Sequence, residues 1–205
     1  MKIVLATQNK HKIDEIQFYL ASLRGPEGFE AIPFDGQIEL KETGTSLHEN
    51  ARQKAVAVAE ATGEWALADD TGLFVTALNG KPGIFSARYA GEKATFQQNT
   101  QKLLEEMKNI PAPQRNAYFS CVLALVHPDG REVIVEGKLE GVIAATPTGN
   151  DGFGYDPIFF LPEKKCTLAE ISLEEKNKIS HRAKALFKMQ IVFDNVDKDQ
   201  NRRII

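Results

Sequence analysis

Trp65-Ala66-Leu67-Ala68-Asp69-Asp70-Thr71-Gly72 is the stretch from which the fold can be worked out. Its four apolar residues predict a short buried strand, which delivers two carboxylates, a hydroxyl and a glycine at its end. Ligands of parallel-type sheets bind at the carboxyl ends of the strands, so Asp69 and Asp70 are expected at a binding crevice. Beside phosphates, the usual partner of such carboxylates is Mg²⁺. The alternative is a polar turn, because Asp, Thr and Gly are common turn residues.

Length and composition limit the class of protein. The chain has 205 residues and a formal net charge of -3, which predicts one soluble domain, with room for two lobes around a cleft. The acidic balance argues against broad binding to nucleic acid or to anionic membranes. No stretch is long enough to span a membrane, and the first apolar run is too short for a signal peptide. The two cysteines suggest reduced thiols, and therefore a cytoplasmic protein.

The segment after the first predicted strand is a candidate phosphate site. Residues 2–7 predict that strand and residues 13–23 an amphipathic helix, with Thr7-Gln8-Asn9-Lys10-His11-Lys12 as the loop between them. Such a loop offers backbone N–H groups and the positive end of the helix dipole, to which Lys10 and Lys12 add charge. It is not a Walker A loop, because the glycines are missing. The alternative is a solvated, lysine-rich helix start.

A second helix leads into the Asp69-Asp70 strand. Ser46 and Glu49 form a Ser-x-x-Glu capping box, and the helix is expected to end at Gly63. Glu42 lies in the loop before this helix, where its carboxylate can approach the same crevice. The alternative is that Glu42 is simply solvated, as exposed glutamates usually are.

The second half of the chain contains more predicted strand. Thr95 is expected to cap a helix that runs to about Asn109. Residues 117–126 and 131–135 read as two strands around the turn 127–130, and residues 139–145 extend the sheet.

Thr148-Gly149-Asn150-Asp151-Gly152-Phe153-Gly154-Tyr155-Asp156-Pro157 is a glycine-rich loop with two aromatic residues. Glycines let the backbone approach a flat ligand on which Phe153 or Tyr155 stacks, and one such contact is worth about 1 to 3 kcal/mol with nucleic-acid bases. The alternative is a corner of the fold with its aromatic side chains in the core.

The last helix begins with charged side chains. Ser172 and Glu175 form another capping box, followed by Lys176, and Ser180 is expected to cap a helix whose first turn holds His181 and Arg182. A cation at a helix N-terminus opposes the dipole, so Arg182 requires a functional role or a nearby glutamate as its partner.

Six motifs, in order along the chain, closely resemble the Ham1-like inosine triphosphate pyrophosphatase family. They are Thr7-x-Asn9-x-x-Lys12, Glu42-Thr43-Gly44, Asp69-Asp70-Thr71-Gly72, Pro82-Gly83-Ile84-x-Ser86-Ala87-Arg88, Gly152-Phe153-Gly154-Tyr155-Asp156-Pro157 and Ser180-His181-Arg182. The chain departs from many members at Gln8, where they have glycine.

The resemblance implies a fold, an activity and a set of site residues. The implied fold is α/β, with a long central mixed β-sheet, flanking helices and two lobes around a cleft. The implied reaction is Mg²⁺-dependent hydrolysis of the non-standard purine nucleotides ITP, dITP and XTP to the monophosphate and pyrophosphate, which clears deaminated purines from the nucleotide pool. Members are generally homodimers.

Residue roles follow from the same resemblance. Asp70 resembles the proton acceptor and a metal ligand, and Glu42 the second metal carboxylate. The implied substrate contacts are Thr7, Gln8, Asn9, Lys10, His11, Lys12, Thr71, Phe153, Gly154, Tyr155, Asp156, Lys176, His181 and Arg182.

Phosphoryl chemistry agrees with these roles, because it needs charge neutralisation and positioning more than covalent help. The hypothesis is that Asp70 orients or deprotonates a water aimed at the α-phosphate, with Mg²⁺, Lys10, Lys12 and Arg88 as cations. A donor to O6 of the base, from Arg182 or from a backbone N–H of residues 153–156, would select 6-keto purines over ATP.

Three alternatives remain at this point. A Maf-like nucleotide pyrophosphatase resembles this fold but opens with a Ser-Pro-Arg-Arg type of loop, unlike residues 7–12. A nucleotide-binding module without catalysis would keep the same binding residues and would lack Mg²⁺-dependent turnover. An RNA-binding protein is disfavoured by the acidic balance.

Overall fold

A computed structural model describes residues 2–22, 30–36, 38, 40 and 42–201, with the backbone alone at residue 22 and at residues 192–201. The chain divides into two compact units. Unit 1 contains residues 1–70, 121–137 and 182–205, and unit 2 contains residues 71–120 and 138–181.

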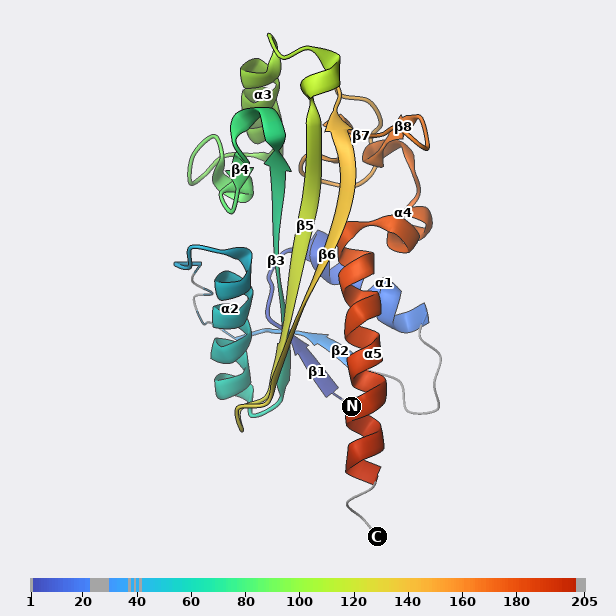
Figure 1. The fold of residues 1–205 in the computed structure, drawn as a ribbon. Helices are drawn as coiled ribbons and strands as arrows, with labels where there is room; N and C mark the ends of the chain where they lie inside the picture. The colour runs from blue at the N-terminus through green and yellow to red at the C-terminus, as the bar shows by residue number, and fades with distance from the viewer. Residues whose placement is uncertain (1, 23–29, 37, 39, 41, 202–205) are drawn as a thin grey trace. The chain divides into compact units, whose positions relative to one another are not determined.

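Helices and strands alternate along the first half of the described chain. The strands are β1 (Lys2–Leu5), β2 (Glu30–Pro33), β3 (Trp65–Val75), β4 (Pro82–Gly83), β5 (Asn116–Val126), β6 (Glu132–Ile143), β7 (Phe159–Leu161) and β8 (Cys166–Thr167). The α-helices are α1 (Lys10–Ser22), α2 (Leu47–Thr62), α3 (Phe96–Met107), α4 (Leu173–Ile179) and α5 (His181–Asn201) (Figure 1). Short 3-10 turns cover Thr76–Leu78, Ser86–Arg88, Ala112–Gln114, Asp156–Ile158 and Leu168–Glu170.

The strands form one mixed sheet in the order β2-β1-β3-β5-β6-β7-β8, with β4 paired to β3. The pairs of β1 with β2 and of β1 with β3 are parallel. The pairs of β3 with β4, of β6 with β7 and of β7 with β8 are antiparallel. The predicted mixed α/β fold with a central sheet and flanking helices is confirmed.

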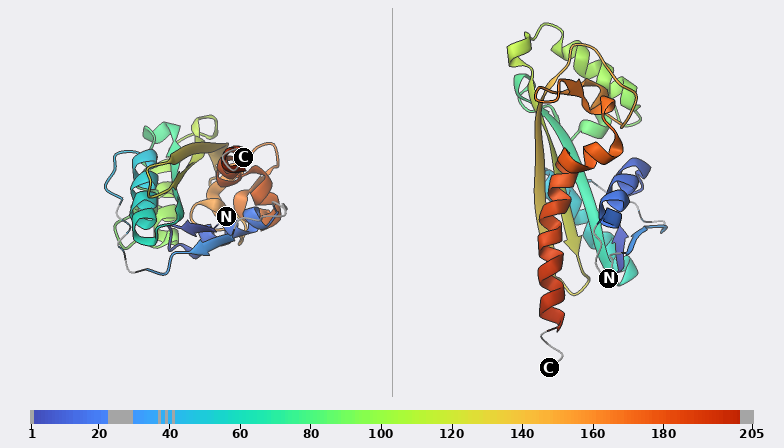
Figure 2. Two further views of the ribbon diagram at one scale, coloured as in Figure 1. Left: turned by 90° about the horizontal axis from the view of Figure 1, so that it is seen from below. Right: turned by 90° about the vertical axis from the view of Figure 1, so that its right-hand side faces the viewer.

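Unit 1 has helices on both faces of its part of the sheet. Helix α2 covers one face, and α1 and α5 cover the other (Figures 1 and 2). Its core consists of apolar side chains on the sheet and on the two helices α1 and α5, namely Ile3, Leu5, Ile16, Leu20, Trp65, Leu67, Cys121, Leu123, Leu125, Ala185, Leu186 and Met189. Strand residues alternate between the faces, so adjacent residues of β3 face different helices.

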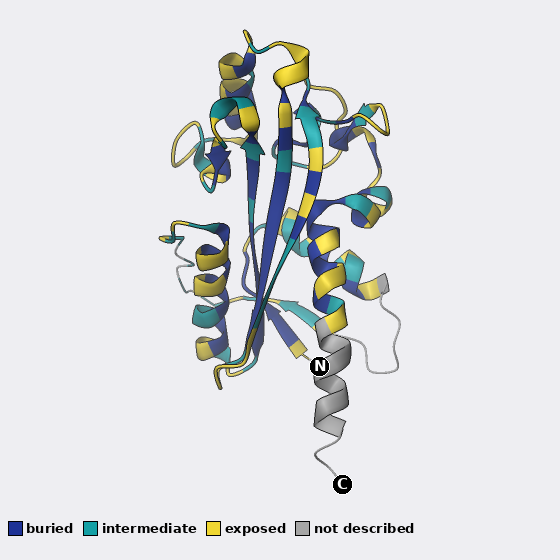
Figure 3. Cartoon of the chain, viewed as in Figure 1, coloured by how far each residue is buried: buried dark blue, intermediate teal, exposed yellow. Residues whose placement is uncertain are grey.

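Unit 2 has a core of its own around the other ends of β3, β5 and β6. It consists of Leu73, Val75, Leu103, Met107, Ala117, Phe119, Leu139, Ile143, Tyr155, Ile158, Phe159, Leu161, Leu168 and Ile171. The long strands β3 and β5 are buried over most of their length (Figure 3).

The helix ends predicted from capping residues are confirmed for α2 and α3. The Ser46 hydroxyl accepts a hydrogen bond from Glu49 N at 3.2 Å, and Gly63 ends α2 in the left-handed conformation with φ 72°. The Glu49 carboxylate in turn accepts from the backbone N–H groups at the start of the helix, with Thr45 N at 2.6 Å. Thr95 and Gln98 make a reciprocal capping box at the start of α3. These boundaries were predictable because each cap satisfies backbone groups within one turn of itself.

Strand β3 differs from its prediction. It does not end at Ala68 and instead continues to Val75, so residues 69–72 are strand and not a turn. Its parallel neighbour β1 ends at Leu5, opposite Leu67, and Asp69-Asp70 therefore still lie just beyond the end of a parallel pair. Gly72 fits in the strand because β4 approaches closely: a Cβ on Gly72 would lie 2.6 Å from the Gly83 carbonyl oxygen.

The predicted strands 131–135 and 139–145 are one strand, β6. Both cysteines are free thiols. Among the helices of the described residues, none is long and apolar enough to cross a membrane.

Candidate active site

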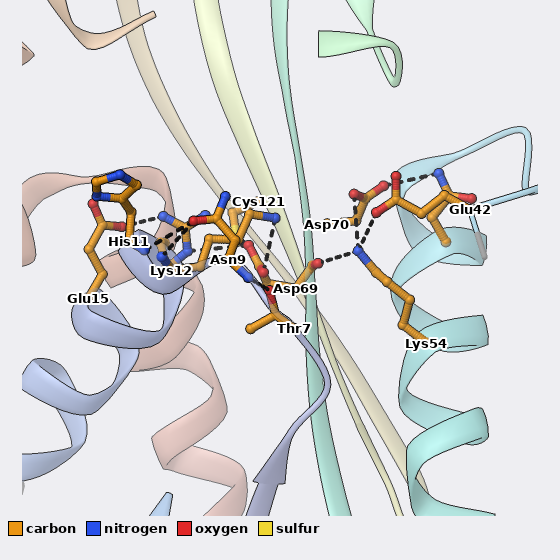
Figure 4. Close-up of polar contacts among 12 residues, drawn as sticks. Thr7, Asn9, His11, Lys12, Glu15, Glu42, Lys54, Asp69, Asp70 and Cys121 are labelled. Atoms are coloured by element: carbon orange, nitrogen blue, oxygen red, sulfur yellow. Dashed lines mark hydrogen bonds and ion pairs between the residues drawn. The ribbon is translucent and has the colours of Figure 1, made fainter. Parts of the chain in front are cut away.

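The predicted phosphate loop is shorter than expected, because α1 begins at Lys10 rather than at Ile13. Asn9 explains the early start. Its side-chain oxygen accepts hydrogen bonds from His11 N at 3.0 Å and Lys12 N at 3.4 Å, which caps the helix, and Thr7 Oγ1 accepts from Asn9 N at 3.2 Å. Two of the N–H groups expected to face a phosphate thus donate to Asn9 (Figure 4).

The charged side chains near this helix start differ in exposure. Gln8, Lys10 and His11 are exposed, whereas Lys12 is half-buried. The Lys12 ammonium lies 3.1 Å from Asp69 Oδ1. Lys10 and Lys12 therefore have different roles: Lys10 extends into solvent, and Lys12 compensates a buried carboxylate.

Asp69 is fully buried on the side of the sheet that α1 and α5 cover (Figure 4). Arg182 donates to its Oδ2 through Nη2 at 2.8 Å and through Nε at 3.3 Å, and Arg182 Nη1 also pairs with Glu15. Burial alone would raise the pKa of Asp69, but Lys12 and Arg182 hold that pKa well below its usual range. Lys12 and Arg182 therefore favour the charged form of Asp69.

Arg182 was predicted to contact the base or to pair with a glutamate. Its side chain is 1% exposed and forms ion pairs with Glu15 and Asp69. Within unit 1, its contacts are therefore those of the predicted ion pair with a glutamate. These pairs also explain how a cation is tolerated in the first turn of α5, since two carboxylates outweigh the helix dipole.

Asp70 faces the opposite side, toward α2 (Figure 4). The Lys54 ammonium lies 3.4 Å from its Oδ1 and 2.6 Å from Glu42 Oε1, and it also donates to the Asp69 carbonyl at 2.7 Å. Asn50 Nδ2 donates to Asp70 Oδ2 at 3.1 Å. The Asp70 and Glu42 carboxylates are thus brought to one ammonium group.

Electrostatics separate Asp70 from Asp69. Burial raises the pKa of the Asp70 carboxyl above its usual value; Lys54 opposes this rise and Glu42 adds to it. Burial lowers the pKa of Lys54, but Asp70, Asp69 and Glu42 together raise it, so its ammonium stays charged. Asp70 is therefore the more basic of the two adjacent aspartates, which suits a proton acceptor.

Glu42 and Asp70 form a donor set that fits Mg²⁺. Both offer carboxylate oxygens, and the Glu42 side chain is 27% exposed, so a cation can reach it from solvent. Among the described residues, no group of three or more His, Cys, Asp or Glu side chains is arranged to hold a metal. Mg²⁺ needs no such group, because it commonly uses one or two carboxylates together with waters and substrate phosphates.

Sequence reasoning missed Asn50 and Lys54. Both lie on α2, four residues apart, and both are buried. A signal was present: with Val58 they form one i, i+4 row on the helix, beside the apolar face that Ala51 and Ala55 define. Because Val58 predicts that this row is buried, Asn50 and Lys54 in the same row must be buried too, and buried polar side chains need polar partners.

In unit 2, the glycine-rich loop is built around Asp156. Its Oδ2 accepts hydrogen bonds from Phe153 N at 2.8 Å and from Lys176 Nζ at 2.6 Å. The Lys176 ammonium also lies 4.8 Å from the centroid of the Phe153 ring. Gly152 has φ 75°, and a Cβ there would lie 2.1 Å from Asp156 Oδ2, so the loop requires glycine at this position.

The two aromatic residues of the loop have different environments. The Phe153 ring is half-buried, and its centroid lies 5.9 Å from the centroid of the Phe96 ring. Tyr155 is buried in the core, and its hydroxyl donates to the Ser86 carbonyl at 2.9 Å, while Gly154 O accepts from Thr100 Oγ1 at 3.2 Å. Tyr155 is therefore a core residue, as the alternative interpretation of the loop predicted. Of the two aromatic side chains, Phe153 is the more exposed and the one that a ligand can reach.

The remaining predicted site residues lie in unit 2. His181 is buried, and its ring stacks on Phe119 with 4.6 Å between centroids. Thr71 is half-buried in β3 and faces the opposite side from Asp70, by strand alternation. Arg88 Nε lies 3.7 Å from Glu92 Oε1, and its guanidinium lies over the Phe85 ring, so its contacts are with its own loop.

Comparison with known proteins shows which proteins this chain resembles. Residues 3–192 match the model of the Ham1 family. A dITP/XTP pyrophosphatase of Desulforamulus reducens is 47% identical over 199 residues, covering 96% of this chain and 97% of that protein.

Two solved structures are similar over nearly the whole chain. A HAM1 protein from Coxiella burnetii has a TM-score of 0.83 and 43% identity, over 95% of this chain and 99% of that one. The Staphylococcus aureus Ham1 protein has a TM-score of 0.83 and 37% identity, over the same shares.

Proposed function

The chain belongs to the Ham1 family, and we propose that it hydrolyses the non-standard purine nucleotides dITP, ITP and XTP to the nucleoside monophosphate and pyrophosphate. This activity removes deaminated purines from the nucleotide pool. The structural observation that supports the proposal is that Asp70 and Glu42 meet at the Lys54 ammonium. This places the candidate proton acceptor, Asp70, beside a second carboxylate with which it could share a metal ion.

Asp70 is the catalytic residue in this proposal. Its raised pKa suits it to orient a water molecule and accept its proton as the water attacks the α-phosphate, with pyrophosphate as the leaving group. Lys54 keeps Asp70 and Glu42 together and offsets their mutual repulsion. Glu42 and Asp70 would hold Mg²⁺, which would supply charge neutralisation for the phosphates.

The phosphates are proposed to meet the start of α1. Lys10 supplies positive charge there and the helix dipole adds to it, while Lys12, whose ammonium is shared with Asp69, is a further candidate contact. Thr7, Gln8, Asn9 and His11 complete this set as candidate contacts, with Asn9 also holding the helix start in shape.

The base is proposed to stack on Phe153. Its ring is held by Lys176, and the loop that carries it is held by Asp156. Thr71, Gly154, Tyr155, His181 and Arg182 remain candidate substrate contacts from the family resemblance. A donor to O6 would favour 6-keto purines, since the 6-amino group of ATP would leave that donor unpaired.

Three further properties belong to the same proposal. We expect Mg²⁺ to be the metal, the active form to be a homodimer and the protein to work in the cytoplasm. Chelation, sedimentation analysis and cell fractionation test these three expectations in turn.

Product analysis tests the reaction itself. The purified protein is incubated with Mg²⁺ and, separately, dITP, ITP, XTP, ATP and GTP, and the products are separated by chromatography. Monophosphate and pyrophosphate from the first three, with ATP and GTP largely spared, are expected. Release of orthophosphate, or equal use of ATP, would contradict the proposed bond or the proposed selectivity. Binding of dITP without turnover would instead support a nucleotide-binding module.

A further inference from the structure

Helix α2 holds both oxygens of the Asp70 carboxylate. Asn50 and Lys54 lie four residues apart, on the same face of the helix. Asn50 Nδ2 donates to Oδ2 at 3.1 Å, while Lys54 Nζ lies 3.4 Å from Oδ1. The two contacts fix the carboxylate plane, because each oxygen has its own partner on a rigid element.

The orientation of the Asn50 amide is itself fixed. Gly44 N donates to Asn50 Oδ1 at 2.8 Å. A backbone N–H can only donate, so the amide oxygen must face Gly44 and the NH₂ group must face Asp70. Asn50 is fully buried, so water does not compete for either contact. Buried polar groups held in this way adopt one arrangement.

The same amide connects two parts of the proposed site. Gly44 follows Glu42 by two residues in the loop before α2, and Asn50 therefore joins the backbone of that loop to Asp70. We propose that Asn50 is a positioning residue, which sets the orientation of the Asp70 carboxylate relative to the Glu42 loop without touching the substrate. This inference rests on the proposed function, in which Asp70 accepts the proton of the attacking water.

Asn50→Asp separates the two contacts of Asn50. The new carboxylate keeps the acceptor for Gly44 N, but it replaces the donor to Asp70 with a second negative charge. Turnover of dITP is measured with Mg²⁺ at saturating and subsaturating nucleotide. We expect kcat to fall about 100-fold with KM changed by less than about 3-fold, since misplacement of a catalytic group costs rate more than binding.

Gln53 provides the matched control. Its Oε1 accepts from Thr43 N and Thr43 Oγ1, each at 3.3 Å, so it holds the same loop to the same helix one turn further on. Gln53→Ala is expected to change kcat by less than about 3-fold. An equal loss of kcat in Gln53→Ala and Asn50→Asp would overturn the inference, because loop attachment alone would then explain both.

A swapped pair tests the contact independently of activity. In Asn50→Asp/Asp70→Asn, the donor and the acceptor exchange places, so the hydrogen bond between positions 50 and 70 is restored. We expect Asn50→Asp to lower the unfolding midpoint and the swap to recover most of the loss, without recovering turnover. If Asn50→Asp does not fold, Asn50→Ala replaces it in the kinetic assay, with the same expected loss of kcat.

The outcomes separate this inference from the function on which it rests. Wild-type protein that does not release pyrophosphate from dITP, ITP or XTP overturns the proposed function, and the role of Asn50 falls with it. Active wild-type protein with an undiminished kcat in Asn50→Asp overturns the role of Asn50 alone. The contact would be overturned if the swapped pair lowered the unfolding midpoint by as much as Asn50→Asp and Asp70→Asn added together.

Discussion

Asp69 and Asp70 are neighbours in strand β3, yet their carboxylates point to opposite faces of the sheet (Figure 4). Asp69 meets Lys12 and Arg182, whose charges keep its pKa low. Asp70 meets Lys54 beside Glu42, and its pKa is raised. Strand alternation thus gives two identical residues different chemistry, and the difference can be tested by substitution.

Asp69→Asn is expected to destabilise the protein by about 3 kcal/mol, because it removes one carboxylate partner of the buried Arg182. Asp70→Asn is expected to change the free energy of unfolding by less than about 1 kcal/mol, because burial already disfavours the charged form of Asp70 and Lys54 keeps Glu42 as a partner. Its turnover should fall by orders of magnitude, because the proton acceptor is lost. Denaturant unfolding and steady-state kinetics on both variants give the comparison. Near-wild-type turnover of Asp70→Asn would rule out its assigned role.

Lys54→Met keeps the length of the side chain and removes its charge. We expect kcat to fall about 100- to 1,000-fold, similar to the loss of a preorganised charge donor, because Glu42 and Asp70 would repel each other. Circular dichroism should confirm that the variant is folded. Lys54→Arg is the control: it retains the charge, and it should lose less activity than Lys54→Met. The reverse order would show that charge is not what Lys54 contributes.

Removal of the metal should stop the reaction without unfolding the protein. The Glu42 and Asp70 carboxylates already have Lys54 as a partner, so their repulsion is offset when no divalent cation is bound. Addition of EDTA is expected to abolish turnover and to leave the melting temperature nearly unchanged, and Mg²⁺ should restore turnover. A large drop in melting temperature with EDTA would mean that a cation also has a structural role.

Phe153→Ala should weaken substrate use without affecting the phosphate chemistry. Stacking of a base on an aromatic ring contributes about 1 to 3 kcal/mol, which corresponds to a loss of roughly 5- to 150-fold in kcat/KM. Phe153→Trp retains a flat ring and should preserve most of kcat/KM. Equal kcat/KM in wild type and Phe153→Ala would exclude Phe153 as the stacking residue.

Arg115 offers a prediction about stability alone. Its guanidinium donates to the carbonyl groups of Met107, Ile110, Ile143 and Ala144 at 2.7 to 3.2 Å. Lysine has a compact ammonium that cannot reproduce this planar set of donors, so Arg115→Lys should lower the free energy of unfolding by about 2 kcal/mol. Thermal and denaturant unfolding measure this loss. An unchanged stability would show that the four carbonyls find other partners.

The local features of the chain were predictable, because their physical causes lie within one turn of the residue concerned. Ser46 and Thr95 cap helices through their own next turn, and Gly63 ends α2 by adopting a positive φ. The six spaced motifs were sufficient to indicate the Ham1 family. The same motifs named Asp70 and Glu42 as candidate site residues.

The full length of β3 was not predictable from local sequence. Asp, Thr and Gly are turn formers, and they stay in the strand because partners distant in the chain compensate them. Arg182 and Lys12 neutralise Asp69, and β4 pairs with the residues that follow. In residues 69–72, tertiary contacts thus outweigh the preference of Asp, Thr and Gly for turns.

The sequence by itself determined the α/β class and the capping residues of α2 and α3, and it named Asp70 and Glu42 as candidate site carboxylates, because periodicity, capping residues and motifs can be read from the order of residues. Only the tertiary structure decided which side chains meet those carboxylates. Asn50 and Lys54 reach Asp70 from 20 and 16 residues away, and Arg182 reaches Asp69 from 113 residues away. Such pairs form because burying a carboxylate is unfavourable unless the fold brings it a donor or a cation.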